Sequence, residues 1–490
     1  MPLRRSLLVL VATLGCSEDL GTLAASSGTD ARPGDDGLSS TSESSTGADP
    51  CAGPFDYGPA ASWSRFGLDL DATRFNTLER AIVPETVACV QPRWQLDGLA
   101  GVTGTPAVVG GTVVVGDLDG RVHARAVGDG TASWTAELGA AVGGSPCTSS
   151  DAVFVGDARG TLHALDRGDG TTLWSRVLDD HPDATIEASP VVASGRVIVG
   201  VSARAPSTAP GFRGSVRAVD AADGHELWQL FTAPADAGVP VRSSAAIDEG
   251  RGLLYLGTGT SDAALPYADA LLAIRLATGA VAWSRRFAVG AAYGEAVPAP
   301  PGTAADLVAS PNLFTAGERA VVGVGDRAGV YAALDRDTGE TVWAVALGRP
   351  GPLGGIMASA TVGDGRVWVA ANLGAAVRDD GREQGDRALV YALDAESGTV
   401  LWSAPASQPI VGALTWAGGV IVHGGLDGSI HALDGLTGVA LWHAQPGGAG
   451  SWGASVVDGT LWAGYGGAWS LLGESTEATG GLVAYGLPTP

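Results

Sequence analysis

A cysteine near the N-terminus stands in a context that predicts covalent lipid attachment. Two arginines precede an apolar run of residues 6–14, and the run is followed by Gly15 and Cys16. A run of this length is too short to span a bilayer and is typical of a cleaved export signal. We therefore expect residues 1–16 to be a lipoprotein signal peptide, with acylation on Cys16. Ordinary cleavage elsewhere is the alternative, because Thr13 replaces the usual Leu or Val.

The segment that follows Cys16 has the composition of a flexible tether. Residues 17–54 are rich in Ser, Thr, Gly and Asp and contain almost nothing to bury. Ser17 rather than Asp follows the cysteine, which in a diderm bacterium favours the outer membrane, facing the periplasm or the surface. The expected location is thus the cell envelope, with the membrane contacted through the lipid alone.

Few other residues have the spacing of a reactive or metal-binding site. Export permits disulfides, and we expect Cys51 to pair with Cys89 and leave Cys147 as a buried thiol, although spacing does not determine the pairing. The seven histidines are scattered and show no zinc-binding spacing. The glycines between 323 and 329 indicate a hairpin turn rather than a dinucleotide loop, because no helix follows.

Composition points to an acidic, all-β protein. The 490 residues include 74 glycines, only 17% are charged, and the net charge is −23. Abundant glycine with valine-rich runs favours strands and tight turns over helices. The negative charge argues against binding to nucleic acid or to an anionic membrane surface.

An eleven-residue pattern recurs along the chain and predicts the architecture. It has the form Ala-x-Asp-x-x-(Thr/Ser/Asp)-Gly-x-x-x-Trp, as in ALDRGDGTTLW at 164–174 and ALDRDTGETVW at 333–343. Seven copies are present, two of them with Ala126 or Arg275 in place of the Asp. Each copy reads as the end of one strand, a tight turn and the next strand, and two further strands precede it. This is a four-stranded antiparallel meander, the blade of a β-propeller.

The number of blades is predicted to be eight. The last unit, from 454 to 486, lacks a terminal tryptophan, whereas Trp94 precedes the first unit without strands before it. A strand around Trp94 that completes the last blade would close a propeller spanning residues 55–490. The expected docking residues, which pack each blade on its neighbour, are Trp94, Trp134, Trp174, Trp228, Trp283, Trp343, Trp402 and Trp442.

The repeat resembles that of the pyrroloquinoline quinone (PQQ) alcohol dehydrogenases, and in particular their polyvinyl-alcohol-dehydrogenase-like branch. The resemblance covers residues 61 to 446, from the lead-in WSRFGLDLDATRFN at 63–76 through HPDATIEASPVV and DLVASPNLF. The outer-membrane assembly lipoprotein of the barrel assembly machinery shares the propeller and the anchor but lacks this lead-in. The resemblance implies an eight-bladed propeller with a funnel that, in active members, holds PQQ and calcium.

Several site residues of that family are replaced in this chain. Carried over from the family pattern, the calcium-binding Glu three residues after Ser202 becomes Ala205, and the calcium-binding Asn becomes Thr260. The floor Trp becomes Arg242, a nearby Thr becomes Glu187, and no vicinal cysteine pair exists. Asp306 is left as a loosely aligned candidate for the catalytic Asp.

These replacements indicate that the quinoprotein site is degenerate. Calcium requires six to eight oxygen ligands, chiefly carboxylates, and Arg242 would add positive charge where the metal binds. Alternatively, Arg204 and Arg242 could pair with the carboxylates of a ligand such as PQQ, or both could be solvated loop residues. We expect no resident cofactor, with PQQ and calcium retained as the cofactors of an enzymatic alternative.

The spacing of the tryptophans indicates which face binds a ligand. The third to sixth blades are the longest, and their extra length lies in insertions at residues 202–212, 261–270, 288–306 and 372–387. Because strands alternate in direction, these connections are expected on the same face of the propeller. Long loops on a rigid scaffold often carry function. We interpret the chain as an envelope lipoprotein whose propeller binds a small ligand or an envelope protein there, without catalysis. The alternatives are a PQQ-dependent alcohol dehydrogenase and a scaffold for outer-membrane protein assembly.

Overall fold

A computed structural model describes most of the chain after residue 48. The described residues are 49–204, 211–234, 238–261, 265–287, 305–351, 353–374, 376–377, 383–384, 388–448, 450, 452–467 and 480–488. The predicted signal peptide and nearly all of the tether lie outside this part. Its only helix is a 3-10 turn, η1 (Val87–Cys89). None of the described helical residues forms a segment long and apolar enough to cross a membrane.

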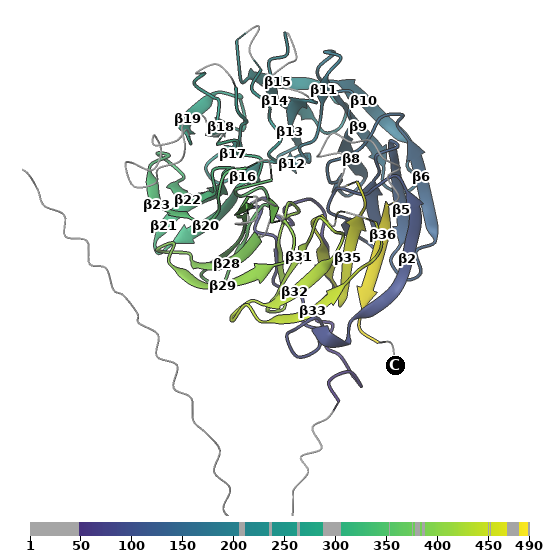
Figure 1. Cartoon of the computed structure of the whole chain (residues 1–490). Coiled ribbons are helices and arrows are strands. Elements are labelled where there is room, and N and C mark those ends of the chain that lie inside the picture. The colour runs from purple at the N-terminus through teal and green to yellow at the C-terminus, as the bar shows by residue number, and fades with distance from the viewer. Residues whose placement is uncertain are drawn as a thin grey trace, which may run out of the picture. The chain divides into compact units, whose positions relative to one another are not determined.

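Eight antiparallel sheets form a ring, which confirms the predicted eight-bladed propeller (Figure 1). The first two blades are β3 (Ala107–Val109), β4 (Thr112–Gly116), β5 (Arg121–Ala126) and β6 (Ala132–Glu137), then β7 (Cys147–Thr148), β8 (Ala152–Gly156), β9 (Thr161–Asp166) and β10 (Thr172–Val177). The third is β12 (Val191–Ala193), β13 (Arg196–Ala203), β14 (Ser215–Asp220) and β15 (Glu226–Phe231), with β11 (Ala184–Thr185) pairing with the end of β13.

The fourth to sixth blades repeat this order of strands. They are β16 (Ala246–Asp248), β17 (Leu253–Gly257), β18 (Ala270–Arg275) and β19 (Val281–Arg286); β20 (Asn312–Ala316), β21 (Arg319–Gly325), β22 (Val330–Asp335) and β23 (Thr341–Ala346); and β24 (Thr361–Gly363), β25 (Arg366–Asn372), β28 (Ala388–Asp394) and β29 (Val400–Ala406). A short hairpin of β26 (Ala376–Val377) and β27 (Glu383–Gln384) lies in the β25–β28 connection.

The last two blades incorporate strands from the N-terminal region. The seventh contains β30 (Thr415–Ala417), β31 (Val420–Gly424), β32 (Ile430–Asp434) and β33 (Ala440–Ala444), with β1 (Phe75–Asn76) parallel to β30. The eighth contains β34 (Ser455–Val457), β35 (Thr460–Tyr465) and β36 (Gly480–Gly486), and its fourth strand is β2 (Gln91–Leu99). β2 runs antiparallel to β36 and carries Trp94. The ring is therefore closed by hydrogen bonds between the two ends of the propeller sequence.

The hydrophobic core lies between neighbouring blades rather than in one central mass. Between the first two blades, for example, Val114 and Val122 pack with Val153 and Leu165, all of them buried. A strand of one blade thus buries its apolar side chains only when the next blade is in place, as expected for stacked repeats.

Each outer-strand tryptophan joins its blade to the following one. Trp134 lies against Gly170 in the turn of the second blade, where a Cβ would come within 2.5 Å of the indole and where φ is +77°. Glycine is needed at this turn on both counts. Every docking indole donates Nε1–H to a backbone carbonyl at 2.9–3.2 Å: Trp94 to Val127, Trp134 to Arg167, Trp174 to Ala221, Trp228 to Leu276, Trp283 to Arg336, Trp343 to Ala395, Trp402 to Gly435, and Trp442 to Val90.

The cysteines lie in two different parts of the propeller. Cys51 and Cys89 are joined by a disulfide, which attaches the start of the described chain to the segment just before β2. Cys147 is a buried free thiol on β7. Cys16 lies outside the described residues.

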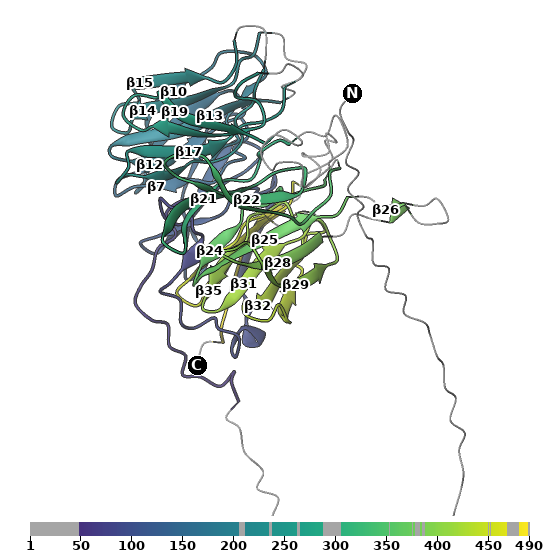
Figure 2. The same ribbon diagram turned by 90° about the vertical axis from the view of Figure 1, so that its left-hand side faces the viewer.

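The two faces of the ring differ. In Figure 2, β26 projects from one side of the ring, and the start of the described chain, drawn in purple, runs along the other. The β26–β27 hairpin belongs to the predicted insertion 372–387. Most of the insertions 202–212 and 288–306, and residues 262–264 of the insertion 261–270, lie outside the described part of the chain.

Candidate functional site

The segment of residues 63–76, here called the lead-in, crosses one end of the channel between the blades. It forms at least one hydrogen bond of 2.7–3.0 Å with every blade: Trp63 with Val108, Ser64 with Thr148, Arg65 with Val192, Leu70 with Ile247, Asp71 with Leu313, Thr73 with Val362, Arg74 with Trp416, and Asn76 with Val456. Eight consecutive blades are thus tied to fourteen consecutive residues. The channel is closed at this end and becomes a funnel.

A ring of serine hydroxyls forms the wall of this funnel. Its hydrogen bonds involve the residue two positions before the first strand of a blade. In five successive pairs of blades, the backbone N–H of this residue donates to the serine Oγ at the same position of the next blade, at 2.8–2.9 Å: Thr105 to Ser145, Ser145 to Ser189, Ser189 to Ser244, Ser244 to Ser310, and Ser310 to Ser359. We call Ser145, Ser189, Ser244, Ser310 and Ser359 the serine ring. Each oxygen accepts from a neighbouring blade, and its own O–H is left to donate.

The ring is interrupted at the seventh and eighth blades, and Arg74 lies there instead. The equivalent positions are Ala413 and Gly453, which have no hydroxyl. Burial lowers the pKa of Arg74 to about 9, so the guanidinium is charged at neutral pH. It donates to Leu414 O (2.6 Å), Thr415 Oγ1 (3.0 Å), Ala454 O (3.1 Å) and Phe66 O.

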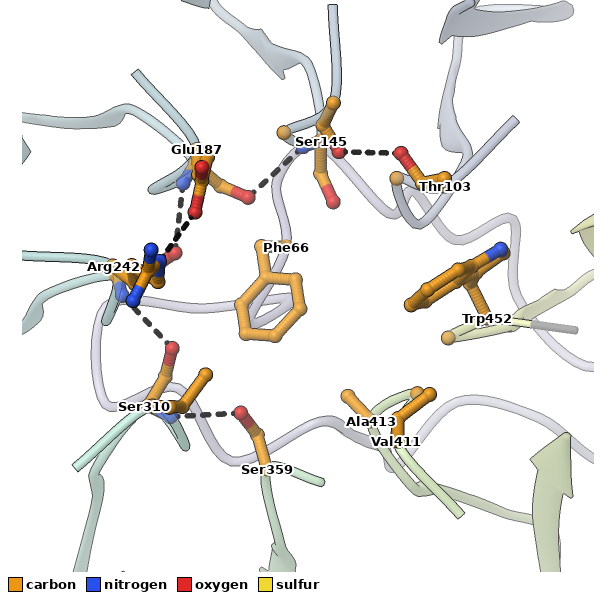
Figure 3. Close-up of a pocket in the computed structure, with 18 of the residues that line it drawn as sticks. Phe66, Thr103, Ser145, Glu187, Arg242, Ser310, Ser359, Val411, Ala413 and Trp452 are labelled. Carbon is orange, nitrogen blue, oxygen red and sulfur yellow. Dashed lines mark hydrogen bonds and ion pairs between the residues drawn. The ribbon is translucent and has the colours of Figure 1, made fainter. Parts of the chain in front are cut away.

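A cavity of about 170 Å³ lies within the ring. Phe66 of the lead-in lies at its centre with the face of its ring toward the viewer of Figure 3, and Trp452 stands at one side. The guanidinium of Arg74 lies 4.8 Å from the Phe66 ring centroid and supports this floor. One half of the wall carries the serine ring, whereas the half around Trp452 is apolar, with Val411 and Ala413.

The described residues lining the cavity include one acid and one base, and these pair with each other. Arg242 Nε donates to Glu187 Oε2 at 2.7 Å, and its Nη2 donates to Ala203 O at 3.2 Å. Burial lowers the pKa of Arg242, but Glu187 and then Asp306 outweigh this effect and raise it above its ordinary value. The pair leaves the described lining without net charge.

Asp306 is buried and interacts electrostatically with both members of this pair. Its Oδ2 is 4.0 Å from Arg327 Nη1, and its Oδ1 would be 2.8 Å from a Cβ at Gly259. Burial raises the pKa of Asp306, while Arg242 and Arg327 oppose the rise. Asp306 and Arg242 are thus close enough to interact electrostatically.

The remaining sequence candidates are dispersed around this cluster. Ser202 is buried on β13, its backbone pairing with that of Thr185. Thr260 donates to Asp269 Oδ1 at 2.6 Å, and Arg204 is exposed and donates to Ala158 O at 3.0 Å. None of these three is among the residues that line the cavity. Ala205 lies outside the described residues.

The described residues do not fit a PQQ–calcium centre. The position expected for a flat floor holds the Arg242 guanidinium, and the hydroxyl of Thr260 is directed to Asp269. Calcium prefers several convergent carboxylates, whereas Asp306 lies between two arginines. Across the described part of the chain, no group of three or more His, Cys, Asp or Glu side chains has an arrangement that could hold a metal ion.

Two functional features were missed by sequence reasoning, although both have a signal. The positions that form the serine ring, with Thr105 before it, repeat as a small residue, then Ser or Thr, then Pro or Ala. This pattern stands at the start of the first six blades, for example GSP at 144–146 and ASP at 188–190. The lead-in was noticed as a family motif but not as the floor of the funnel. The lead-in forms hydrogen bonds with all eight blades only because the blades are arranged in a ring, and the linear sequence does not show this arrangement.

Two family models match the chain. One is described as outer membrane protein assembly factor BamB and matches residues 85–207 and 326–485, more than half of the chain. The other, the β-propeller domain of glucose/ethanol/alcohol dehydrogenases, matches residues 179–361. Both models describe PQQ-repeat propellers, and together they span the blades from end to end.

Individual proteins give the same result. A polyvinylalcohol dehydrogenase from a Pseudomonas species is 26% identical over 445 residues, covering 79% of this chain and 68% of the relative. A second, from Sphingopyxis sp. (strain 113P3), is 26% identical over 322 residues, covering 55% of this chain and about half (48%) of the relative. The quinohemoprotein alcohol dehydrogenase ADHIIG of Pseudomonas putida HK5 has a similar fold, with a TM-score of 0.72 at 19% identity over 88% of this chain and 82% of that one.

Proposed function

Because this chain belongs to the PQQ-repeat β-propeller family, with a funnel at its centre, we propose that it is an envelope lipoprotein that binds a ligand in that funnel without quinone chemistry. One observation carries the proposal. Arg242 is paired with Glu187 at 2.7 Å in the funnel wall and lies in the field of Asp306. The arginine is therefore already neutralised by protein carboxylates. The described side chains that line the cavity offer no surplus positive charge to a tricarboxylate such as PQQ, because Arg74 lies beneath Phe66 and does not line the cavity.

The N-terminal sequence supports the location in the envelope. The apolar run ending at Cys16 has the length of an export signal, and the tether that follows provides reach between a lipid and the propeller. The Cys51–Cys89 disulfide is compatible with an oxidising compartment. The funnel opens opposite the lead-in, on the face from which β26 projects (Figure 2), so a ligand or an envelope partner would approach from there.

Calorimetric titration of PQQ, with and without calcium, tests the absence of a quinoprotein centre. We expect no calcium-dependent binding by the natural chain. A variant with Ala205→Glu, Thr260→Asn and Arg242→Trp restores the family's residues and should gain such binding, because each restored charge-assisted contact is worth about 1.5–3 kcal/mol. Micromolar, calcium-dependent binding by the natural chain would overturn the proposal.

One observation favours a second candidate, a PQQ-dependent alcohol dehydrogenase. Asp306 is buried, close to Gly259 and to Arg327, with a pKa raised by burial. A buried carboxylate beside an arginine has the features of a general base. The relatives named polyvinylalcohol dehydrogenase are consistent with this candidate. PQQ-dependent oxidation of a secondary alcohol, abolished by Asp306→Asn, would establish it.

The family model described as an assembly factor favours a third candidate, a scaffold in outer-membrane protein assembly. It requires a protein partner rather than a small ligand in the funnel. Co-purification with barrel-assembly components from envelope extracts would support it. Their absence from the purified lipoprotein would leave the ligand-binding proposal in first place.

A further inference from the structure

The funnel combines three kinds of surface that one class of ligand would use together. Phe66 provides an aromatic floor, and Trp452 provides an aromatic wall. The serine ring provides hydroxyl groups from five neighbouring blades. The Arg242–Glu187 pair provides a donor and an acceptor side by side.

The aromatic floor is held rigidly in place. Arg74 donates to the backbone oxygen of Phe66 and lies over its ring at 4.8 Å, while its other hydrogen bonds connect it to the seventh and eighth blades. Trp452 is fixed by its own hydrogen bond from Nε1 to Gly466 O at 2.8 Å. Rigid aromatic surfaces bind flat apolar faces at a low cost in conformational entropy.

The serine ring can donate hydrogen bonds around the edge of such a ligand. Every one of the five oxygens accepts a backbone N–H from the blade before it, which fixes the oxygen and leaves the O–H direction adjustable. Within the described residues, none of these hydroxyls donates to a protein acceptor in the structure. A ligand rich in hydroxyl groups has acceptors to offer to all of them.

Charge separates a neutral ligand from an anionic one. An anion approaching Arg242 would meet the carboxylate of Glu187 at 2.7 Å from that guanidinium and the field of Asp306. The repulsion offsets the attraction, whereas a neutral pair of hydroxyls can accept from Arg242 and donate to Glu187 without a charge penalty.

We propose that the funnel binds one neutral sugar ring, with an apolar face on Phe66 and its hydroxyl groups bonded to the serine ring and to the Arg242–Glu187 pair. This inference rests on the proposed ligand-binding function. The lead-in closes the far end of the funnel, so the ring is either a free monosaccharide or the terminal unit of a glycan, not an internal unit. In both cases the recognised chemistry is the same.

Isothermal titration calorimetry of the full chain tests the proposal with glucose, galactose, mannose and, as the charged analogue, glucuronate. We expect at least one neutral sugar to bind with a dissociation constant of about 1 mM or lower, and glucuronate to bind more weakly than glucose. Maltose and cellobiose distinguish a glycan end from a free monosaccharide as the ligand. If they bind more tightly than glucose, the ligand is the end of a glycan; if they bind equally or more weakly, the ligand is a free sugar. No binding of any neutral sugar at about 10 mM would overturn the proposal.

Variants then assign the binding to the funnel. Phe66→Leu keeps an apolar side chain but removes the ring, and should weaken sugar binding about tenfold. Its control is Phe231→Leu, because Phe231 also lies under an arginine, Arg213 at 3.6 Å, but outside the funnel. Unchanged affinity in Phe66→Leu would exclude the funnel as the binding site.

Glu187→Gln tests the role of charge. The variant leaves Arg242 without its hydrogen-bonded carboxylate, so the preference should shift toward glucuronate by about tenfold. Glu226→Gln is the matched control, because Glu226 pairs with Arg217 at the same 2.7 Å on the third blade, away from the funnel. An unshifted preference would contradict the proposed recognition. The PQQ titration tests the absence of a quinoprotein centre, and the sugar titrations test the identity of the ligand. Because neither result determines the other, the two proposals are tested separately.

Discussion

At the scale of single residues, Arg74 connects the lead-in to the last two blades. Its side chain is completely buried, and no carboxylate of a described residue pairs with it. Instead it donates to three backbone carbonyls and one threonine hydroxyl. A buried charge of this kind is tolerated because each of its three nitrogens donates at least one hydrogen bond. Arg74 thus supplies hydrogen-bond donors at the seventh and eighth blades, the two blades without a hydroxyl at the position of the serine ring.

Arg74→Met should therefore destabilise the propeller. The change keeps a long side chain but leaves buried carbonyl oxygens without donors, each at a cost of about 1–3 kcal/mol. We expect the free energy of unfolding to fall by about 3 kcal/mol or more, measured by chemical denaturation. Arg80→Met is the control, since Arg80 also donates to two carbonyls but is exposed. Equal effects in the two variants would contradict the role given to Arg74.

A second residue-scale feature is a row of histidines across the seventh blade. His423, His431 and His443 are cross-strand neighbours, and the first two rings are stacked at 5.1 Å between centroids. His423 is buried, and its Nδ1 has no hydrogen-bond partner. Burial, with the neighbouring His431, lowers the pKa of His423 from 6.5 to about 3. Burial also lowers the pKa of His431.

This pKa predicts that stability falls on acidification. Below pH 6.5 the unfolded chain protonates His423 while the folded chain does not, so the free energy of unfolding decreases by about 1.4 kcal/mol per pH unit down to about pH 3. Valine stands at the equivalent positions of the first two blades, Val115 and Val155. The variant His423→Val should therefore remove the part of the acid-dependent loss of stability that comes from His423. Melting temperatures at pH 7 and pH 5 provide the measurement, with exposed His225→Asn as the control. An equal pH dependence in His423→Val would show that His423 is not responsible.

At the scale of elements, two N-terminal segments complete the ring in different ways. β2 supplies the outer strand of the eighth blade, whereas the lead-in bonds to all eight blades at the channel end. The lead-in turns tightly: Leu68, Ala72 and Arg74 adopt positive φ angles of 53–72°, which L-residues rarely take. Contacts with every blade stabilise this conformation.

Deleting residues 90–96 should open the ring. The eighth blade would lose most of its outer strand, and Trp94 could no longer donate to Val127 of the first blade. We expect the melting temperature to fall by at least about 5 °C and the protein to aggregate through the exposed edge. Differential scanning calorimetry and light scattering measure both effects. A deletion of equal length in the tether, at residues 20–26, is the control, and an unchanged, monomeric β2 deletion would argue against closure by this strand.

The sequence predicted the blades better than the site, for a physical reason. A docking tryptophan and the glycine turn it contacts are both parts of one local repeat, so their spacing is visible along the chain. Arg242 and Glu187, in contrast, are 55 residues apart and meet because consecutive blades stand side by side. The serine ring is periodic, but its hydrogen bonds run between blades. Only the closed ring shows that five such positions face one cavity.

At the scale of the whole molecule, the propeller presents a closed end and an open end. The closed end is the lead-in, and the β26–β27 hairpin projects from the other face of the ring (Figure 2). A lipid on Cys16 would hold this assembly at a membrane through a tether that begins at residue 17 and ends before Cys51, where the disulfide to Cys89 attaches the chain to the propeller. Such a tether spans a long distance without fixing an orientation. The funnel could then sample ligands while the protein stays in the envelope.

Cys16→Ser tests this arrangement in cells. A hydroxyl cannot take the place of the thiol in lipoprotein acylation. We expect the variant to move from the membrane fraction to a soluble fraction, followed by immunoblotting after cell fractionation. Cys147→Ser is the control, because Cys147 is buried in the second blade and should leave fractionation unchanged. Retention of Cys16→Ser in membranes at the natural level would contradict the lipid anchor and would direct the search for attachment to the propeller itself.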